Sequence, residues 1–134
     1  MSLLRRMPAA ALVLLLAAGA ALAQPAPGDG LDGSVWKVRP NTFMAKVLFW
    51  RYDHISFKNG EFLSAERKAH GFQPGPYTAV KAGEGVSWTA TLQSPDEGKV
   101  VWEGKRAADR MTGTWTWMKL DGKTKVVGWT ALRI

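Results

Sequence analysis

Apolar and polar residues alternate along the C-terminal half of the chain. In residues 86–93 an apolar side chain stands at every second position, from Val86 to Leu92, with serine, threonine or glutamine between. Residues 111–117 repeat the pattern, with tryptophan or another nonpolar residue alternating with threonine. A period of two is typical of a half-buried antiparallel strand, whereas a helix places apolar residues three and four positions apart. We therefore predict a β-meander from Val86 to Trp129.

Four short segments rich in turn residues separate these runs and define how the strands pair. They are residues 82–85, 94–98, 107–110 and 120–122. Treating each as the loop of a hairpin assigns a partner to each strand residue. The assignment produces two rows of inward-facing residues: Tyr77, Ala90, Trp102, Trp115 and Val127 in one, and Ala79, Trp88, Gly104, Gly113 and Trp129 in the other. Large and small residues alternate in both rows, as expected in a curved interior where glycine makes room for a neighbouring ring.

Shorter patterns predict strands in the N-terminal half. Residues 34–38 fit a first strand, which carries on one face Ser34, Trp36 and Val38. Asn59-Gly60 lies between residues 53–57 and 61–64. Asn-Gly between two alternating runs is a strong signal for a tight β-hairpin, and it places Phe57 opposite Phe62.

Two segments are less regular. Asn41–Tyr52 fits a helix and a buried strand about equally well, and residues 65–76 form a longer polar connection. The total is about eight strands with short loops. This predicts an all-β fold, an antiparallel up-and-down meander that closes into a roughly eight-stranded barrel or packs as a small sandwich. An eight-stranded barrel is either filled by its own side chains or holds one small ligand.

The N-terminal segment has the features of an export signal. Arg5 and Arg6 precede an apolar run over residues 9–18, and Ala21-Leu22-Ala23 supplies the small residues of a cleavage site. We expect a signal peptide at residues 1–23, a flexible Pro/Gly linker at 24–30 and a single β-barrel domain at 31–134. The expected location is the periplasm or the exterior of a bacterial cell.

Composition and charge narrow the classes of partner. The chain has no cysteine, so neither disulfides nor a lipid-attachment cysteine are expected. Its 18 Lys and Arg residues become 16 without Arg5 and Arg6, and against 11 Asp and Glu they leave a net charge of +5. This charge is not clustered among exposed aromatic residues, which argues against nucleic-acid binding. We expect no membrane span after signal cleavage, whereas a protein partner is compatible with the pattern.

Two sets of residues carry a resemblance to known families. Gly33-Ser34-Val35-Trp36 and Arg133 resemble the lipocalin-like (calycin) barrels, which have a Gly-x-Trp on the first strand and an Arg near the chain end. Here the spacing is Gly-x-x-Trp. The resemblance implies that Arg133 packs across the Trp36 ring and caps one barrel end. Similarity to the avidin-type barrels is weaker, because the residue two after Trp36 is Val38 and not Asn.

Most of the chain beyond the leader is also similar to a family of small exported bacterial proteins without an assigned activity. The similarity rests on FKNGEFLSAERKAHGFQPGPY and SWTATLQSPDEGKVVWEG. This similarity implies the same fold and does not indicate an activity.

The aromatic residues are the candidate ligand-binding set. Those that would line a cavity and stack on a flat or apolar ligand are Tyr77, Trp88, Trp102, Trp115, Trp117 and Trp129. The alternative is that they simply fill the barrel. Burying one large aromatic ring removes about 150–250 Å² from water, and a small domain without cysteine needs several such burials to fold.

The sequence gives little support for a metal site or a catalytic site. The two histidines, His54 and His70, are far apart in sequence, and Asp53 beside His54 points to the opposite face of its strand, so we expect no metal site. No serine lies in a strand-to-helix nucleophile turn, and Glu103 has no evident carboxylate partner. We therefore expect neither an enzyme nor a cofactor.

Two functions follow from these patterns. In the first, an exported lipocalin-like barrel binds a small hydrophobic or aromatic ligand in its Trp-lined interior. In the second, the protein is a non-catalytic interaction or structural module of the cell envelope with a filled core and a working outer face. The volume of the interior discriminates between them.

Overall fold

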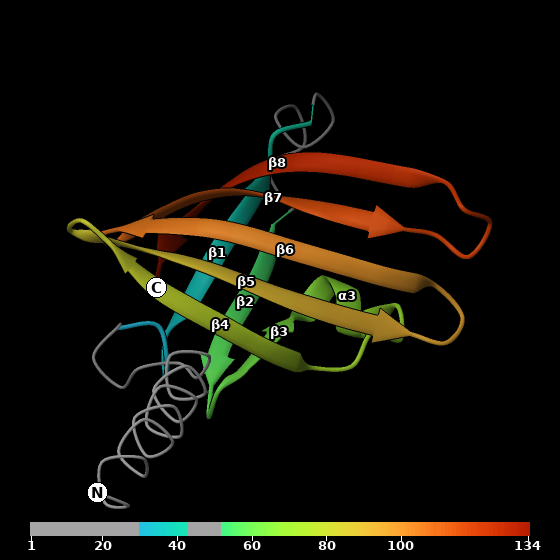
Figure 1. The fold of residues 1–134 in the computed structure, drawn as a ribbon, viewed down its shortest axis with the longest axis horizontal. Coiled ribbons are helices and arrows are strands. Elements are labelled where there is room, and N and C mark those ends of the chain that lie inside the picture. Colours follow the sequence, from blue (N-terminus) through green and yellow to red (C-terminus); the bar gives the residue numbers. More distant parts are fainter. Residues whose placement is uncertain (1–29, 43–51) are drawn as a thin grey trace, which may run out of the picture.

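The strands form a single closed barrel (Figure 1). The computed structural model describes residues 30–42 and 52–134, so the expected signal peptide, most of the linker and most of Asn41–Tyr52 lie outside the described residues. The strands are β1 (Val35–Pro40), β2 (Asp53–Lys58), β3 (Glu61–Ser64), β4 (Gly75–Ala82), β5 (Gly85–Ser94), β6 (Gly98–Ala107), β7 (Arg110–Met118) and β8 (Thr124–Arg133). Each pairs antiparallel with the next, and β8 pairs with β1. The predicted all-β meander is confirmed, and it closes as a barrel.

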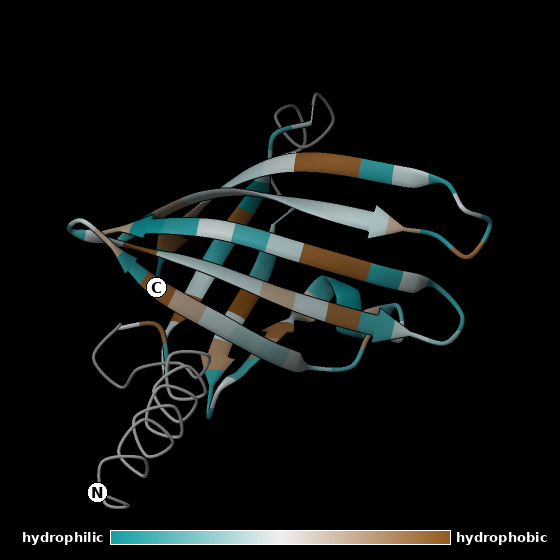
Figure 2. Ribbon diagram, viewed as in Figure 1, coloured by the Kyte–Doolittle hydropathy of each residue, from teal (hydrophilic) through white to brown (hydrophobic). Residues whose placement is uncertain are grey.

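The register predicted from the turns is confirmed in all the C-terminal hairpins. Tyr77 lies opposite Ala90, and Trp102 lies opposite both Ala90 and Trp115. In the other row, Gly104 lies between Trp88 and Gly113, and Gly113 also pairs with Trp129. A slip of one residue would turn the tryptophans outward. Figure 2 shows the resulting mixture of apolar and polar segments along the strands.

Gly104 and Gly113 are the positions where the barrel interior requires glycine. A Cβ atom on Gly104 would lie 2.5 Å from the Trp88 ring. A Cβ atom on Gly113 would lie 2.0 Å from the Glu103 carbonyl oxygen and 2.6 Å from the Trp129 ring. The two glycines are paired across β6 and β7, so two indole rings fit against a part of the wall that has no inward side chains.

The β2–β3 hairpin also forms as predicted. Asn59 and Gly60 have φ angles of 53° and 78°, the left-handed conformation that a two-residue turn of this kind requires. Phe57 lies opposite Phe62, and both are fully buried.

A short helix, α3 (Ala65–Ala69), lies within the segment predicted as a polar connection. Ser64 caps it, because its Oγ accepts a hydrogen bond from the Arg67 backbone N–H at 3.2 Å. The helix ends at His70, and Gly71 follows with a φ of 91°. Five residues are too few for a helical period to be visible in the sequence.

Candidate functional site

The barrel interior holds a cluster of aromatic rings in mutual contact. The Trp88 centroid is 4.8 Å from that of Phe57, 5.2 Å from that of Phe62 and 5.9 Å from that of Trp129. Trp102 lies 5.6 Å from Trp129. These rings are at most 3% exposed. Aromatic rings at such separations are packed against one another, so a ligand would enter the cluster only by displacing one of them.

Trp115 and Trp117 lie at the edge of this cluster, beneath α3. Trp115 is 6.4 Å from Trp102 and 7% exposed. The partly buried Trp117 donates its indole N–H to the Glu97 carbonyl at 2.7 Å. The Arg67 guanidinium lies over both rings, 4.4 Å from the Trp115 centroid and 5.2 Å from that of Trp117. Cation–π contacts of this kind hold the side chain over the rings.

Tyr77 contacts the cluster with its ring and the start of the domain with its hydroxyl. Its ring meets Phe57 edge-on at 4.9 Å, and its O–H donates to the Asp32 carboxylate at 3.1 Å. Asp32 also accepts the backbone N–H groups of Asn59 and Gly60. These bonds, the one from Gly60 first, lower the pKa of Asp32. The segment before β1 is thereby fastened to the β2–β3 turn.

Trp36 is fully buried beside the chain terminus. It pairs with Arg133 across β1 and β8, and the Arg133 guanidinium lies 5.8 Å from the centroid of its ring. The Trp36 indole N–H donates to Ser34 Oγ at 2.7 Å. Ser34 in turn donates to the Leu31 carbonyl. The sequence pattern placed Ser34 on the same face as Trp36 but did not predict the hydrogen bond between them.

Three other buried indole N–H groups of the described residues have no hydrogen-bond partner there. They belong to Trp88, Trp102 and Trp129. A buried donor without an acceptor costs about 1–3 kcal/mol. Among the described residues, the interior therefore presents three donors without an acceptor, a feature that the apolar pattern of the sequence does not reveal.

Asp53 is a buried carboxylate that the sequence did not single out. It accepts hydrogen bonds from the Ser64 hydroxyl and from the Glu66 backbone N–H. Burial raises its pKa above the ordinary value of 3.8, and the bond to Ser64 opposes that shift. Both hydrogen bonds tie β2 to the N-terminus of α3, so we interpret Asp53 as a residue that positions the helix.

The titratable residues do not assemble a metal site within residues 30–42 and 52–134, where no three His, Asp or Glu side chains gather. His54 is exposed on β2, with the neighbouring Asp53 turned inward. His70 lies 3.4 Å from the exposed Glu66 one helical turn away. No helix in these residues is long and apolar enough to cross a membrane.

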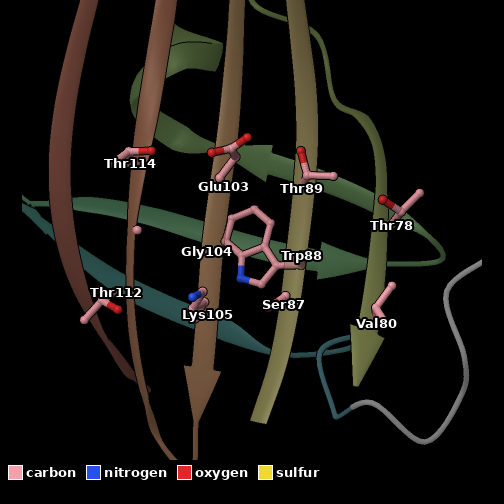
Figure 3. Close-up of a pocket in the computed structure, with 11 residues that line it drawn as sticks. Thr78, Val80, Ser87, Trp88, Thr89, Glu103, Gly104, Lys105, Thr112 and Thr114 are labelled. Carbon is pink, nitrogen blue, oxygen red and sulfur yellow. The ribbon is translucent and has the colours of Figure 1, made fainter. Parts of the chain in front are cut away.

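A cleft of about 680 Å³ lies on the outer wall, across β4, β5, β6 and β7 (Figure 3). The backbone at Gly104 and Gly113 contributes to its lining. The Trp88 ring lies against Gly104 (Figure 3). Two rows of outward residues form its sides: Thr78, Thr89, Glu103 and Thr114 in one, and Val80, Ser87, Lys105 and Thr112 in the other. The sides are therefore rich in hydroxyl groups, with one carboxylate and one ammonium group.

A second cleft, of about 370 Å³, lies on the outer wall over β1, β7 and β8. Three cationic side chains line it, namely Lys37, Arg39 and Arg110. Lys37 also lies 4.0 Å from the centroid of the Tyr52 ring. Thr112 and Thr130 add hydroxyl groups, and the described residues that line this cleft include no Asp or Glu.

No family model, curated protein or solved structure matches the chain. The barrel is compatible with the lipocalin-like architecture that the sequence resembles. The structure brings Trp88, Trp102 and Trp129 together, with Trp115 and Trp117 at the edge and Tyr77 beside Phe57. Ligand binding by these residues stays a prediction.

Proposed function

We propose that this protein is a non-catalytic binding module of the cell envelope, whose filled barrel is a scaffold and whose outer wall is the binding surface. The observation that carries the proposal is the packing of the interior. The rings of Trp88, Trp102 and Trp129 are at most 3% exposed and in contact with their neighbours. Both clefts described above lie on the outer wall, and most of the side chains that line them point outward. The wall can bind a partner without any rearrangement of the core.

Site-specific photocrosslinking in a bacterial host that exports the full chain tests this proposal. A photoreactive residue replaces Thr89 or Thr114 at the sides of the first cleft, or Arg110 beside the second. A matched control replaces Glu84 in the exposed β4–β5 turn. We expect a discrete adduct from at least one cleft position and none from the control. Uniform labelling from every position, or from none, contradicts a specific outer binding surface.

A second function, a small ligand inside the barrel, is favoured by the three indole N–H groups without partners. A ligand that carries an oxygen acceptor would satisfy donors that the protein leaves unpaired. Native mass spectrometry of the exported protein, with NMR of its ¹⁵N-labelled indoles, discriminates between the two functions. A retained small molecule, together with shifts of the Trp88, Trp102 and Trp129 indole signals on ligand addition, refutes the filled scaffold and supports the carrier.

A further inference from the structure

Four adjoining strands form a part of the outer wall whose strand residues include no exposed Asp or Glu. The sequences of β1, β7 and β8 contain no Asp or Glu, and the single one in β2, Asp53, is buried. These strands are consecutive around the closed barrel, in the order β7, β8, β1, β2. We call the outer surface of these four strands the acid-free face. Of the other strands, β3 and β6 carry the exposed carboxylates Glu61 and Glu103, and β4 and β5 contain no Asp or Glu.

Positive charge is gathered on the acid-free face by the pairing of β8 with both of its neighbours. Lys37 on β1 and Arg110 on β7 both pair with Leu132 on β8, so the two cations flank this one residue. Arg39 is the next outward-facing residue of β1 after Lys37. All three cations line the second cleft, of about 370 Å³. Lys37 and Arg110 are exposed to solvent. Two strands apart, they are separated by about 10 Å.

Exposed apolar side chains lie among these charges. Leu132 is 54% exposed, Val35 is 40% exposed, and Ile134 just beyond β8 is 68% exposed. Of the large hydrophobic residues described as exposed, most belong to β1, β8 and the residue that follows β8. Cations that surround exposed aliphatic groups are the combination that binds at the surface of an anionic bilayer, where charge attracts and apolar groups enter the interface.

We propose that the acid-free face docks reversibly on a bilayer of anionic phospholipid. Lys37, Arg39 and Arg110 face the headgroup phosphates, and Leu132 reaches the boundary of the acyl chains. A soluble phosphate would need donors that converge on one point, whereas these cations are spread over two non-adjacent strands. The proposal rests on the proposed function only in taking the outer wall as the binding surface.

Co-sedimentation with vesicles tests the proposal on the mature chain. The vesicles contain one part phosphatidylglycerol to three parts phosphatidylcholine, with pure phosphatidylcholine as the comparison. Each Lys or Arg near such a surface contributes about a fivefold change in binding. The double variant Lys37→Gln with Arg110→Gln is therefore expected to bind about 30-fold more weakly than the wild type. All substituted side chains are exposed, so unfolding midpoints should stay close to that of the wild type.

A matched double variant controls for net charge. Lys81→Gln with Lys99→Gln removes the same charge from β4 and β6, outside the acid-free face; Lys99 lies opposite Met118, at the far end of β7 from Arg110. It should weaken binding no more than about threefold, since only long-range attraction is lost. Leu132→Ser, which leaves charge unchanged, should weaken binding about fivefold through the lost apolar contact.

Four results would overturn the proposal. They are equal binding to both kinds of vesicle, equal losses in the two double variants, release of the protein by millimolar inorganic phosphate, or tighter binding to a DNA oligonucleotide than to vesicles. The last two assign the cations to a soluble anion or to nucleic acid. A ligand retained inside the barrel would refute the proposed function, in which the core is filled. The charge variants would still show whether the acid-free face binds vesicles, because they do not alter the interior.

Discussion

The substitution Gly104→Ala tests the packing on which the whole fold depends. The added methyl carbon would lie 2.5–2.6 Å from three atoms of the Trp88 indole, whereas ordinary contacts begin near 3.4 Å. The ring cannot simply move away, because Phe57, Phe62 and Trp129 contact it. Overpacking a tight core costs about 1–3 kcal/mol, and a clash with an immobile ring belongs at the upper end. We expect a loss of about 3 kcal/mol in the free energy of unfolding.

Denaturant unfolding and thermal melting of the protein measure this loss. At about 4–8 °C per kcal/mol for a domain of this size, the melting temperature should fall by roughly 15 °C. Gly128→Ala is the matched control on β8, since its Cβ atom would meet nothing closer than 3.6 Å. It should change the free energy of unfolding by less than about 0.5 kcal/mol.

A double-mutant cycle assigns the cost to the indole ring. Trp88→Phe removes the atoms that the new methyl group would meet, so Gly104→Ala should cost at least about 1 kcal/mol less in that background. The reasoning is refuted if Gly104→Ala and Gly128→Ala are equally stable. It is refuted equally if the penalty of Gly104→Ala persists unchanged in the Trp88→Phe protein.

Four further predictions concern single substitutions outside the glycine-lined part of the wall. Ser34→Ala removes the acceptor of the buried Trp36 indole and should cost about 1–3 kcal/mol in unfolding experiments. Arg133→Gln removes only an exposed cation at 5.8 Å and should cost about 0.5 kcal/mol, so equal losses in these two variants would contradict the assignment. Arg67→Met should cost about 1 kcal/mol and change the tryptophan fluorescence, because the guanidinium no longer lies over Trp115. Unaltered emission would show that the contact is not kept in solution. Because burial raises the pKa of Asp53, the folded state holds that proton more tightly than the unfolded chain. The stability that Asp53 contributes is therefore present below pH 3.8 and is lost as pH rises through the raised pKa. Asp53→Asn should remove this pH dependence. If the difference in free energy of unfolding between wild type and variant does not change with pH above 3.8, the prediction is wrong.

The residues that could be located from sequence are those governed by local patterns. The alternation around Trp88 and Trp102, the Asn59-Gly60 turn and the strand glycines all act between residues close in the chain, so turn length alone sets their register. The helix α3 was missed because five residues show no period. Asp53 was read correctly as turned away from His54, but its burial depends on Ser64 and Glu66, which are brought to it by the path of β3.

The sequence alone determined which residues of the C-terminal strands face inward, because strand period and turn chemistry are short-range properties. Only the tertiary structure decided whether those inward rings meet or enclose a space, since that depends on how far the strands tilt and stagger when β1 pairs with β8. The same long-range pairing brings Lys37 and Arg110 to the two sides of Leu132. No local pattern specifies that meeting, because the residues are separated by most of the folded chain and become neighbours only when the barrel closes.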